Sequence, residues 1–159
     1  MRFLLLALIA AAQPAAADEL ALNLYGFSYH FKRDKARELG LTEEFNPGLG
    51  LRWRMRQSAR RDVFADAGFY RDSAGRRAIV AGGGLLWHAG ESLRLGGGLA
   101  VFQSDTYNEG KAFLTPVPIA AYETRLGTFN MVFFPRFGSM NEVSQVGFWL
   151  SIPLRRIDR

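Results

Sequence analysis

The sequence predicts an all-β protein that folds as an eight-stranded antiparallel up-and-down transmembrane β-barrel. Eight segments alternate apolar and polar residues with a period of two, which is the pattern of strands with two different faces. The connections between them are alternately long and short, as in outer-membrane barrels with long external loops and short periplasmic turns. No apolar run reaches the roughly 20 residues of a transmembrane helix, so a membrane-inserted form must be a closed barrel.

The first 17 residues carry the features of an export signal. Met1-Arg2 forms a basic start, residues 3–12 are apolar, and Ala15-Ala16-Ala17 supplies the small residues of a cleavage site. We therefore expect residues 1–17 to be a signal peptide and residues 18–159 to form a single outer-membrane β-barrel domain.

The composition narrows the class of protein further. The 159 residues include 20 Lys and Arg against 15 Asp and Glu, which gives a net charge of +5, and there is no Cys. The absence of Cys excludes the disulfide-stapled class of small exported domains. We expect no cofactor, no metal site and no nucleic-acid partner, and we expect a monomer.

The eight segments follow one another at regular spacing. They lie at residues 20–31, 48–57, 63–70, 78–88, 93–104, 112–123, 128–134 and 143–154. Long connections (32–47, 71–77, 105–111 and 135–142) follow the odd-numbered segments. Short connections (58–62, 89–92 and 124–127) follow the even-numbered ones. An even number of strands with this alternation places both chain ends in the periplasm.

Each segment has one apolar face and one face that holds charges and glycines. In the first segment, for example, Tyr25, Phe27, Tyr29 and Phe31 share a face. We expect the apolar face to contact lipid. A soluble up-and-down barrel with the two faces exchanged would show the same periodicity. The aromatic enrichment and the loop asymmetry favour the membrane form.

Charged residues on the inward face gather near the periplasmic end. Buried charges need partners, so we expect these side chains to form ion pairs that plug the lower barrel. They are Arg52, Arg54, Arg56, Asp66, His88, Arg94 and Glu123.

Glycines dominate the inward face nearer the outer end. An eight-stranded barrel normally fills its own interior with side chains, so these glycines predict a pocket for a hydrocarbon chain. Gly50, Gly82, Gly84 and Gly98 are its expected lining. The alternative is that the glycines serve strand curvature and bulges.

Prolines near the outer ends of two neighbouring segments predict a break in the barrel wall. Pro116 and Pro118 lie in the sixth segment, and Pro135 follows the seventh. Proline has no N–H to donate to the next strand. A lipid chain could enter from the side through such a break, whereas the alternative is that these prolines mark a loop boundary.

Three residues at the expected outer mouth could carry out chemistry. His30 ends the first segment, and Asp72 and Ser73 follow the third. A histidine with a carboxylate and a hydroxyl can supply the general base and the oxyanion or nucleophilic groups of acyl transfer. The alternative is that any barrel mouth collects polar residues. Basic side chains in the same loops suit lipid phosphates: Lys32, Arg33, Lys35, Arg37, Arg71, Arg76, Arg77, Lys111 and Arg136.

Several short motifs occur in a characteristic order along the chain. They are Ser28-Tyr29-His30, Phe69-Tyr70-Arg71-Asp72-Ser73, Ala81-Gly82-Gly83-Gly84, Asp105-Thr106-Tyr107-Asn108, Pro116-Val117-Pro118-Ile119-Ala120 and Thr128-Phe129-Asn130-Met131. In this order the chain resembles the outer-membrane lipid A palmitoyltransferases, the PagP family.

The resemblance implies a barrel that moves a palmitoyl chain from a phospholipid to lipid A. The family's essential His, Asp and Ser carry over onto His30, Asp72 and Ser73. Gly84 matches the floor of the family's acyl pocket, and Pro118 and Pro135 match the prolines beside its side entrance. The sequence departs from the family in having no room for an amphipathic helix before the first segment and in having Ala74 where a tryptophan is usual.

We therefore expect an acyltransferase of the bacterial outer membrane, with a phospholipid donor and lipid A or lipopolysaccharide as acceptor. Two alternatives stay open at this point. One is a deacylase of lipid A or phospholipid on the same barrel. The other is a non-catalytic structural barrel.

Overall fold

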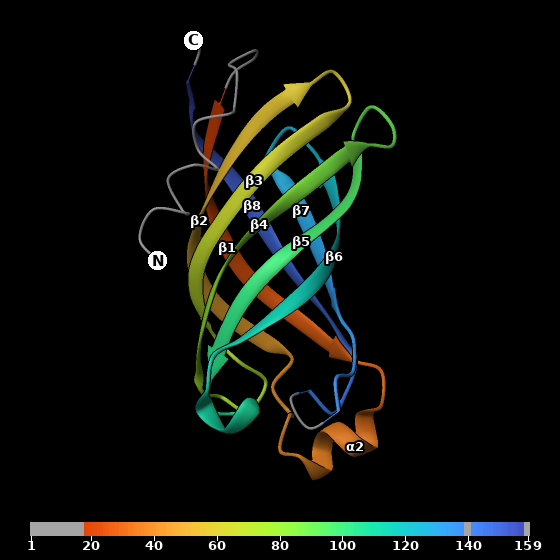
Figure 1. The fold of residues 1–159 in the computed structure, drawn as a ribbon. Coiled ribbons are helices and arrows are strands. Elements are labelled where there is room, and N and C mark those ends of the chain that lie inside the picture. Colours follow the sequence, from red (N-terminus) through yellow and green to blue (C-terminus); the bar gives the residue numbers. More distant parts are fainter. Residues whose placement is uncertain (1–17, 139–140, 158–159) are drawn as a thin grey trace, which may run out of the picture.

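The computed structural model describes residues 18–138 and 141–157, with side chains described as far as residue 154. The segment predicted to be a signal peptide lies outside the described residues. Eight antiparallel strands close into one barrel, each paired with the next in sequence and β1 with β8 (Figure 1). This confirms the predicted fold class. The strands are β1 (Asp18–His30), β2 (Phe45–Ser58), β3 (Arg61–Arg71), β4 (Arg77–His88), β5 (Leu93–Ser104), β6 (Phe113–Glu123), β7 (Thr128–Phe134) and β8 (Gln145–Ile157).

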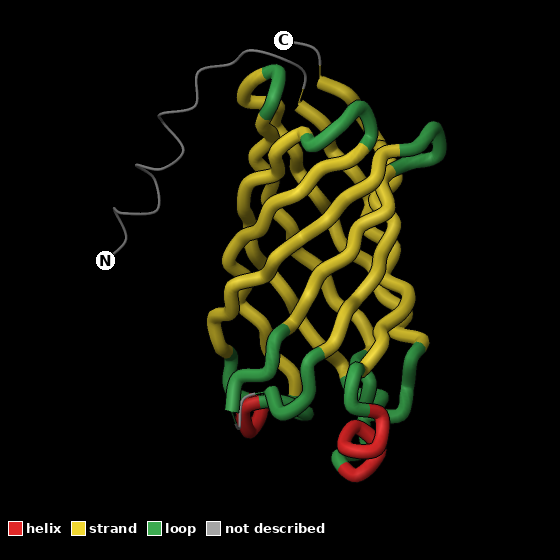
Figure 2. The backbone as a smooth tube through the Cα atoms, turned by 90° about the vertical axis from the view of Figure 1, so that its right-hand side faces the viewer, coloured by secondary structure: helices red, strands yellow, loops and turns green. Residues whose placement is uncertain are grey.

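The two ends of the barrel differ, as the connection lengths predict. At the end where β1 begins and β8 ends, short turns join β2 to β3, β4 to β5 and β6 to β7; we call this the turn end. The opposite end, the loop end, carries the longer connections, including helix α2 (Arg33–Glu38) and the 3₁₀ turn η1 (Asn108–Gly110). Figure 2 shows both helical turns at the loop end. Among the described residues, no helix is long and apolar enough to span a bilayer.

Apolar side chains cover the outer surface of the barrel. In β2, Leu51 is 50% exposed and Trp53 40%, whereas Arg52 between them is 2% exposed. This arrangement excludes the soluble barrel with exchanged faces, because a protein surrounded by water would turn the arginine outward. The same outward facing recurs around the wall at Leu49, Phe69, Ile79, Leu95, Leu99, Val101, Phe129 and Phe148.

The side chain of Tyr25 faces the barrel interior, and the prediction that it faces lipid was wrong. The sequence pattern puts it on the lipid side with Phe27, but both ladders of β1 shift register between these two residues. A bulge of this kind adds one residue to the strand and reverses the alternation beyond it. Tyr25 therefore points inward, where its ring lies 5.1 Å from that of Tyr70 and 6.2 Å from that of Trp149, measured between centroids.

The predicted charged plug fills the turn half of the barrel. Arg54 pairs with Glu19 at 3.1 Å and with Glu123, and Arg94 pairs with Glu123 at 2.7 Å. His88 Nε2 lies 3.1 Å from a carboxylate oxygen of Asp62. Glu19 and Asp62 are members that the sequence did not predict. Arg56 was predicted inside, but its side chain is half exposed at the rim, 3.9 Å from Asp62.

A second polar layer lies above this plug, near mid-height. The Arg52 guanidinium donates to both oxygens of Asp66 and, at 2.6 Å, to the side-chain oxygen of Asn130. Asn23 donates to Asp66 at 3.0 Å, and Ser151 donates to Asn23 at 2.6 Å. The network joins five strands across the lumen.

The barrel wall is broken between β6 and β7 at the loop end. Their ladder runs from Glu123 opposite Thr128 only as far as Ile119 opposite Val132. Beyond that rung β6 stays paired with β5 up to Phe113 but has no partner on β7. The break lies where the prolines predict one; that a lipid chain enters through it stays a prediction.

Candidate functional site

A cavity of about 100 Å³ occupies the barrel between the Arg52 layer and the loop end. One water molecule needs roughly 10–15 Å³ of such space, so the cavity is large enough for several water molecules. Its wall is mostly apolar and is contributed by nearly every strand. The inward-facing side chains of the apolar wall include Val80, Ala100, Val117, Ile119, Val132 and Phe134.

The floor of the cavity rests on the mid-height polar layer. Phe64, Trp149 and Asp66 line it there. The Arg52 guanidinium carbon lies 4.8 Å from the Phe64 ring centroid and 5.5 Å from that of Trp149, close enough for cation–π attraction. The hydrogen-bonded arginine thus closes the cavity toward the turn end and fixes its depth.

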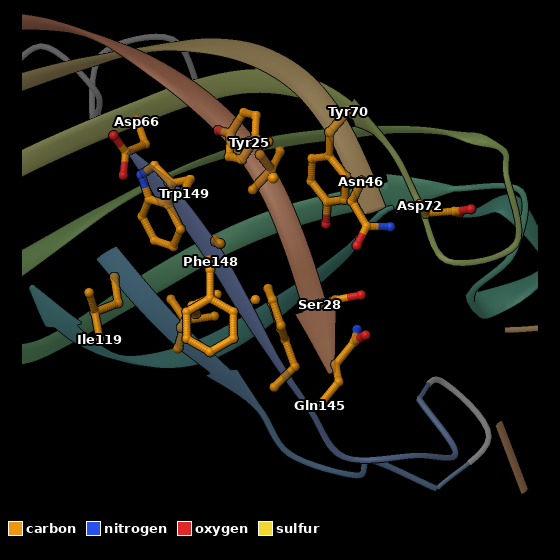
Figure 3. Close-up of a pocket in the computed structure, with 18 of the residues that line it drawn as sticks. Tyr25, Ser28, Asn46, Asp66, Tyr70, Asp72, Ile119, Gln145, Phe148 and Trp149 are labelled. Atoms are coloured by element: carbon orange, nitrogen blue, oxygen red, sulfur yellow. The ribbon is translucent and has the colours of Figure 1, made fainter. Parts of the chain in front are cut away.

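The roof of the cavity, at the loop end, is polar. Figure 3 shows Ser28, Asn46 and Gln145 gathered at one end of the cavity together with Tyr70, with Trp149 and Asp66 at the other. An apolar body beneath a polar roof suits an amphiphile with one chain. The roof residues are Ser28, Asn46, Asp72, Ser73, Tyr107 and Gln145.

Of the four glycines predicted to line the acyl pocket, the structure places Gly82 at the cavity wall. Gly50, Gly84 and Gly98 are not among the lining residues. All four glycines are pressed against the backbone of a neighbouring strand. A Cβ added to Gly84 would lie 2.1 Å from the carbonyl oxygen of Gly97. Here glycine permits close approach of β4 and β5 rather than leaving space for a ligand.

Asp72 and Ser73 both line the cavity roof, as predicted for a site at the barrel mouth. Ser73 Oγ lies 3.1 Å from Ser28 Oγ on β1. His30 is the next inward-facing residue of β1 after Ser28 and is 3% exposed, but it does not line the cavity. Among the described residues no hydrogen bond joins His30 to Asp72 or Ser73; its interactions are with Gln145 and Glu44.

The carboxylate of Asp72 is occupied by its own loop. One oxygen accepts from the backbone N–H of Ala74 at 3.0 Å and of Arg76 at 2.9 Å, and the other accepts from the hydroxyl of Ser104. These bonds fix the β3–β4 connection against β5. Asp72 therefore holds the roof in place, and Gln145 is the side chain that contacts His30.

Several buried polar atoms around the cavity have no hydrogen-bond partner among the described residues. Two belong to the amide of Asn46, and one each belongs to Tyr107, Trp149 and His30. Nearly all buried polar groups in folded proteins are paired with protein or with ordered water, so these atoms are candidate contacts for water or for a polar ligand. Burial and the nearby Asp72 carboxylate raise the pKa of Tyr107, which therefore remains a protonated donor.

Sequence reasoning missed Asn46, Tyr107 and Gln145 as roof residues. Asn46 was assigned to a loop, whereas β2 begins at Phe45. Because side chains alternate along a strand, Asn46 faces the same side as Gly48, which was predicted to face inward, and this spacing could have identified it. Tyr107 was noticed only as part of a motif. Within the described residues no group of three or more His, Cys, Asp or Glu could hold a metal ion.

No protein-family model matches the chain, and no curated protein matches it. Among solved structures, a de novo designed transmembrane β-barrel is similar with a TM-score of 0.54 and 10% identity, over 90% of this chain and 99% of that one. The chain has a transmembrane β-barrel fold. Ail of Yersinia pestis, solved with the heparin analogue sucrose octasulfate, has a TM-score of 0.45 and 11% identity, over 91% of this chain and 100% of that one.

Proposed function

We propose that this protein is an acyltransferase of the bacterial outer membrane that moves a palmitoyl-type chain from a phospholipid to lipid A or lipopolysaccharide. The observation that carries the proposal is the cavity. Its apolar body, its polar roof and the break in the wall between β6 and β7 all lie in the loop half of the barrel. A chain entering at the break would lie along the apolar wall with its ester at the roof.

The reaction is a transesterification. A hydroxyl of the acceptor attacks the ester carbonyl of the donor, the acyl–oxygen bond to glycerol breaks, and a lysophospholipid leaves. His30 is the proposed general base, because its buried Nε2 has no partner among the described residues. It would take the proton of the attacking hydroxyl and return it to the departing glycerol oxygen. Ser73 would stabilise charge at the carbonyl.

The loop end also suits a phosphorylated acceptor. Arg71 and Arg77 face each other across the β3–β4 ladder, next to Arg76, and among the described residues no carboxylate forms an ion pair with any of the three. Like charges directly opposite one another in a sheet are destabilising unless an anion lies nearby. The phosphates of lipid A are such anions.

The second candidate is a non-catalytic barrel. It is favoured by one specific observation, which is that no hydrogen bond joins His30 to Asp72 or Ser73 among the described residues. In that case the roof residues would serve folding or ligand retention alone.

Mass spectrometry of lipid A from cells that express the wild-type protein or His30→Ala separates these functions. The proposal predicts a lipid A species heavier by one acyl chain, present with the wild type and absent with His30→Ala. A species lighter by one chain would indicate a deacylase. Unchanged lipid A and phospholipid with a folded wild-type protein would support the non-catalytic barrel.

A further inference from the structure

Asn46 is the most incompletely satisfied side chain of the cavity roof. It faces the lumen from the loop end of β2, is 5% exposed, and neither its Nδ2 nor its Oδ1 has a partner among the described residues. Figure 3 shows the amide between Tyr70 and Ser28 at the polar end of the cavity. A primary amide offers two donor hydrogens and two acceptor lone pairs. Burying all of them without a partner is costly, so the position calls for a ligand.

The charges around the cavity restrict what that ligand can be. Among the described lining residues there is no Lys, Arg or His, and the charged ones are Asp66 and Asp72. Asp66 is engaged by Arg52 and Asp72 by its own loop. A phosphate or a free carboxylate at the roof would lack a countercharge and would face Asp72. An uncharged polar group avoids both penalties.

Tyr107 supplies a second donor near the same roof. It reaches the cavity from the segment between β5 and η1 and is buried, with the Gln145 side chain beside its oxygen; among the described residues nothing accepts the hydrogen of its hydroxyl. An ester carbonyl oxygen has two lone pairs and can accept from two donors at once.

We propose that Asn46 and Tyr107 form a binding site for the uncharged ester group of an acyl lipid. Asn46 Nδ2 and the Tyr107 hydroxyl donate to the two lone pairs of the ester carbonyl oxygen. The orientation of the lipid, with its chain in the apolar body, rests on the proposed function. The hydrogen bonds themselves are a property of binding and can be measured without turnover.

The test compares binding of two lipids to the full-length protein in detergent. One is dipalmitoyl phosphatidylcholine, and the other is its diether analogue, which keeps the chains and headgroup but has no carbonyl. Each lipid is titrated against the wild type, Asn46→Leu, Tyr107→Phe and the control Gln57→Leu, which alters an exposed amide at the turn end of β2 outside the cavity. For each protein we take the ratio of its affinity for the ester lipid to its affinity for the ether lipid. The change in this ratio from the wild type to a variant measures the contact between the substituted side chain and the ester carbonyl.

We expect the wild type and Gln57→Leu to prefer the ester lipid, and Asn46→Leu to lose about five- to tenfold of that preference, as for one hydrogen bond. Tyr107→Phe keeps the shape of the side chain and should lose a similar or smaller part, so the test does not depend on the folding of Asn46→Leu alone. An ester preference that survives in both variants would overturn the inference. Equal binding of the two lipids to the wild type would overturn it too, while leaving the proposed function standing. If the wild type binds neither lipid, the proposed function fails with it.

Discussion

Arg52 and Asp66 lie directly opposite each other on β2 and β3, and the Arg52 guanidinium donates to both carboxylate oxygens of Asp66 at 2.8 and 2.6 Å. Both residues point into the barrel, and Arg52 also donates to Asn130 on β7. Such two-pronged pairs are stronger than single charged hydrogen bonds and fix the geometry of both partners. This pair is the structural base of the cavity above it, because Phe64 and Trp149 lie against the same guanidinium.

Removing only the arginine should therefore destabilise the barrel strongly. In Arg52→Met the buried Asp66 carboxylate loses its countercharge, and we expect the free energy of unfolding to fall by about 3–5 kcal/mol. Urea unfolding of the refolded barrel in detergent micelles measures it. The double variant Arg52→Met/Asp66→Leu should recover most of the loss, and Arg60→Met in the exposed β2–β3 turn should change little. Equal stability of Arg52→Met and the wild type would contradict the pairing.

Substitution of Gly84 should affect folding rather than chain length. A Cβ at this position meets the carbonyl oxygen of Gly97 at 2.1 Å and the Cα of Gly98 at 2.6 Å, so β4 must move away from β5. We expect Gly84→Ala to cost about 1–3 kcal/mol, the usual range for overpacking. Gly90→Ala in the β4–β5 turn is the matched control, because its nearest contact is 4.0 Å away. A fully stable Gly84→Ala with altered chain-length preference would instead make Gly84 part of the acyl pocket.

An engineered disulfide can close the break between β6 and β7 reversibly. The chain contains no native Cys that would compete for disulfide formation. Pro118 and Phe133 follow the last rung of the ladder, and a disulfide between Pro118→Cys and Phe133→Cys would extend the pairing into the break. If lipid enters there, oxidation should strongly lower acyl transfer and a reductant should restore it. The control pair Tyr122→Cys/Phe129→Cys bridges an existing rung and should leave transfer unchanged. An oxidised Pro118/Phe133 pair with full activity would contradict entrance at this side.

Most of the fold could be predicted from the sequence, since the period-two pattern of a two-faced strand is strong wherever one face meets lipid. All eight strands are present, with ends that differ by a few residues. The facing of Tyr25 could not be predicted, because a bulge changes the phase without leaving a mark in the alternation. Asp62 was assigned to a turn and Glu19 lay just before the first expected segment, so neither was counted inside.

The candidate site was predicted less completely. The pattern placed Asp72 and Ser73 at the mouth, and both line the cavity there. It could not decide whether a strand glycine leaves space or brings two backbones together, and for Gly84 the structure has the second arrangement. Asn46 and Gln145 owe their importance to the cavity that they line with residues far away in sequence, and the sequence alone does not reveal that cavity.

The most direct test of the account follows one labelled acyl chain. Purified protein in detergent is given phosphatidylcholine with a ¹³C-labelled palmitoyl group at the sn-1 position together with lipid A, and both lipids are analysed by mass spectrometry over time. We predict that the label appears in lipid A, that unlabelled lysophospholipid accumulates in equal amount, and that His30→Ala abolishes both. Label that stays in phosphatidylcholine when the folded wild-type protein is present would contradict the acyltransferase function.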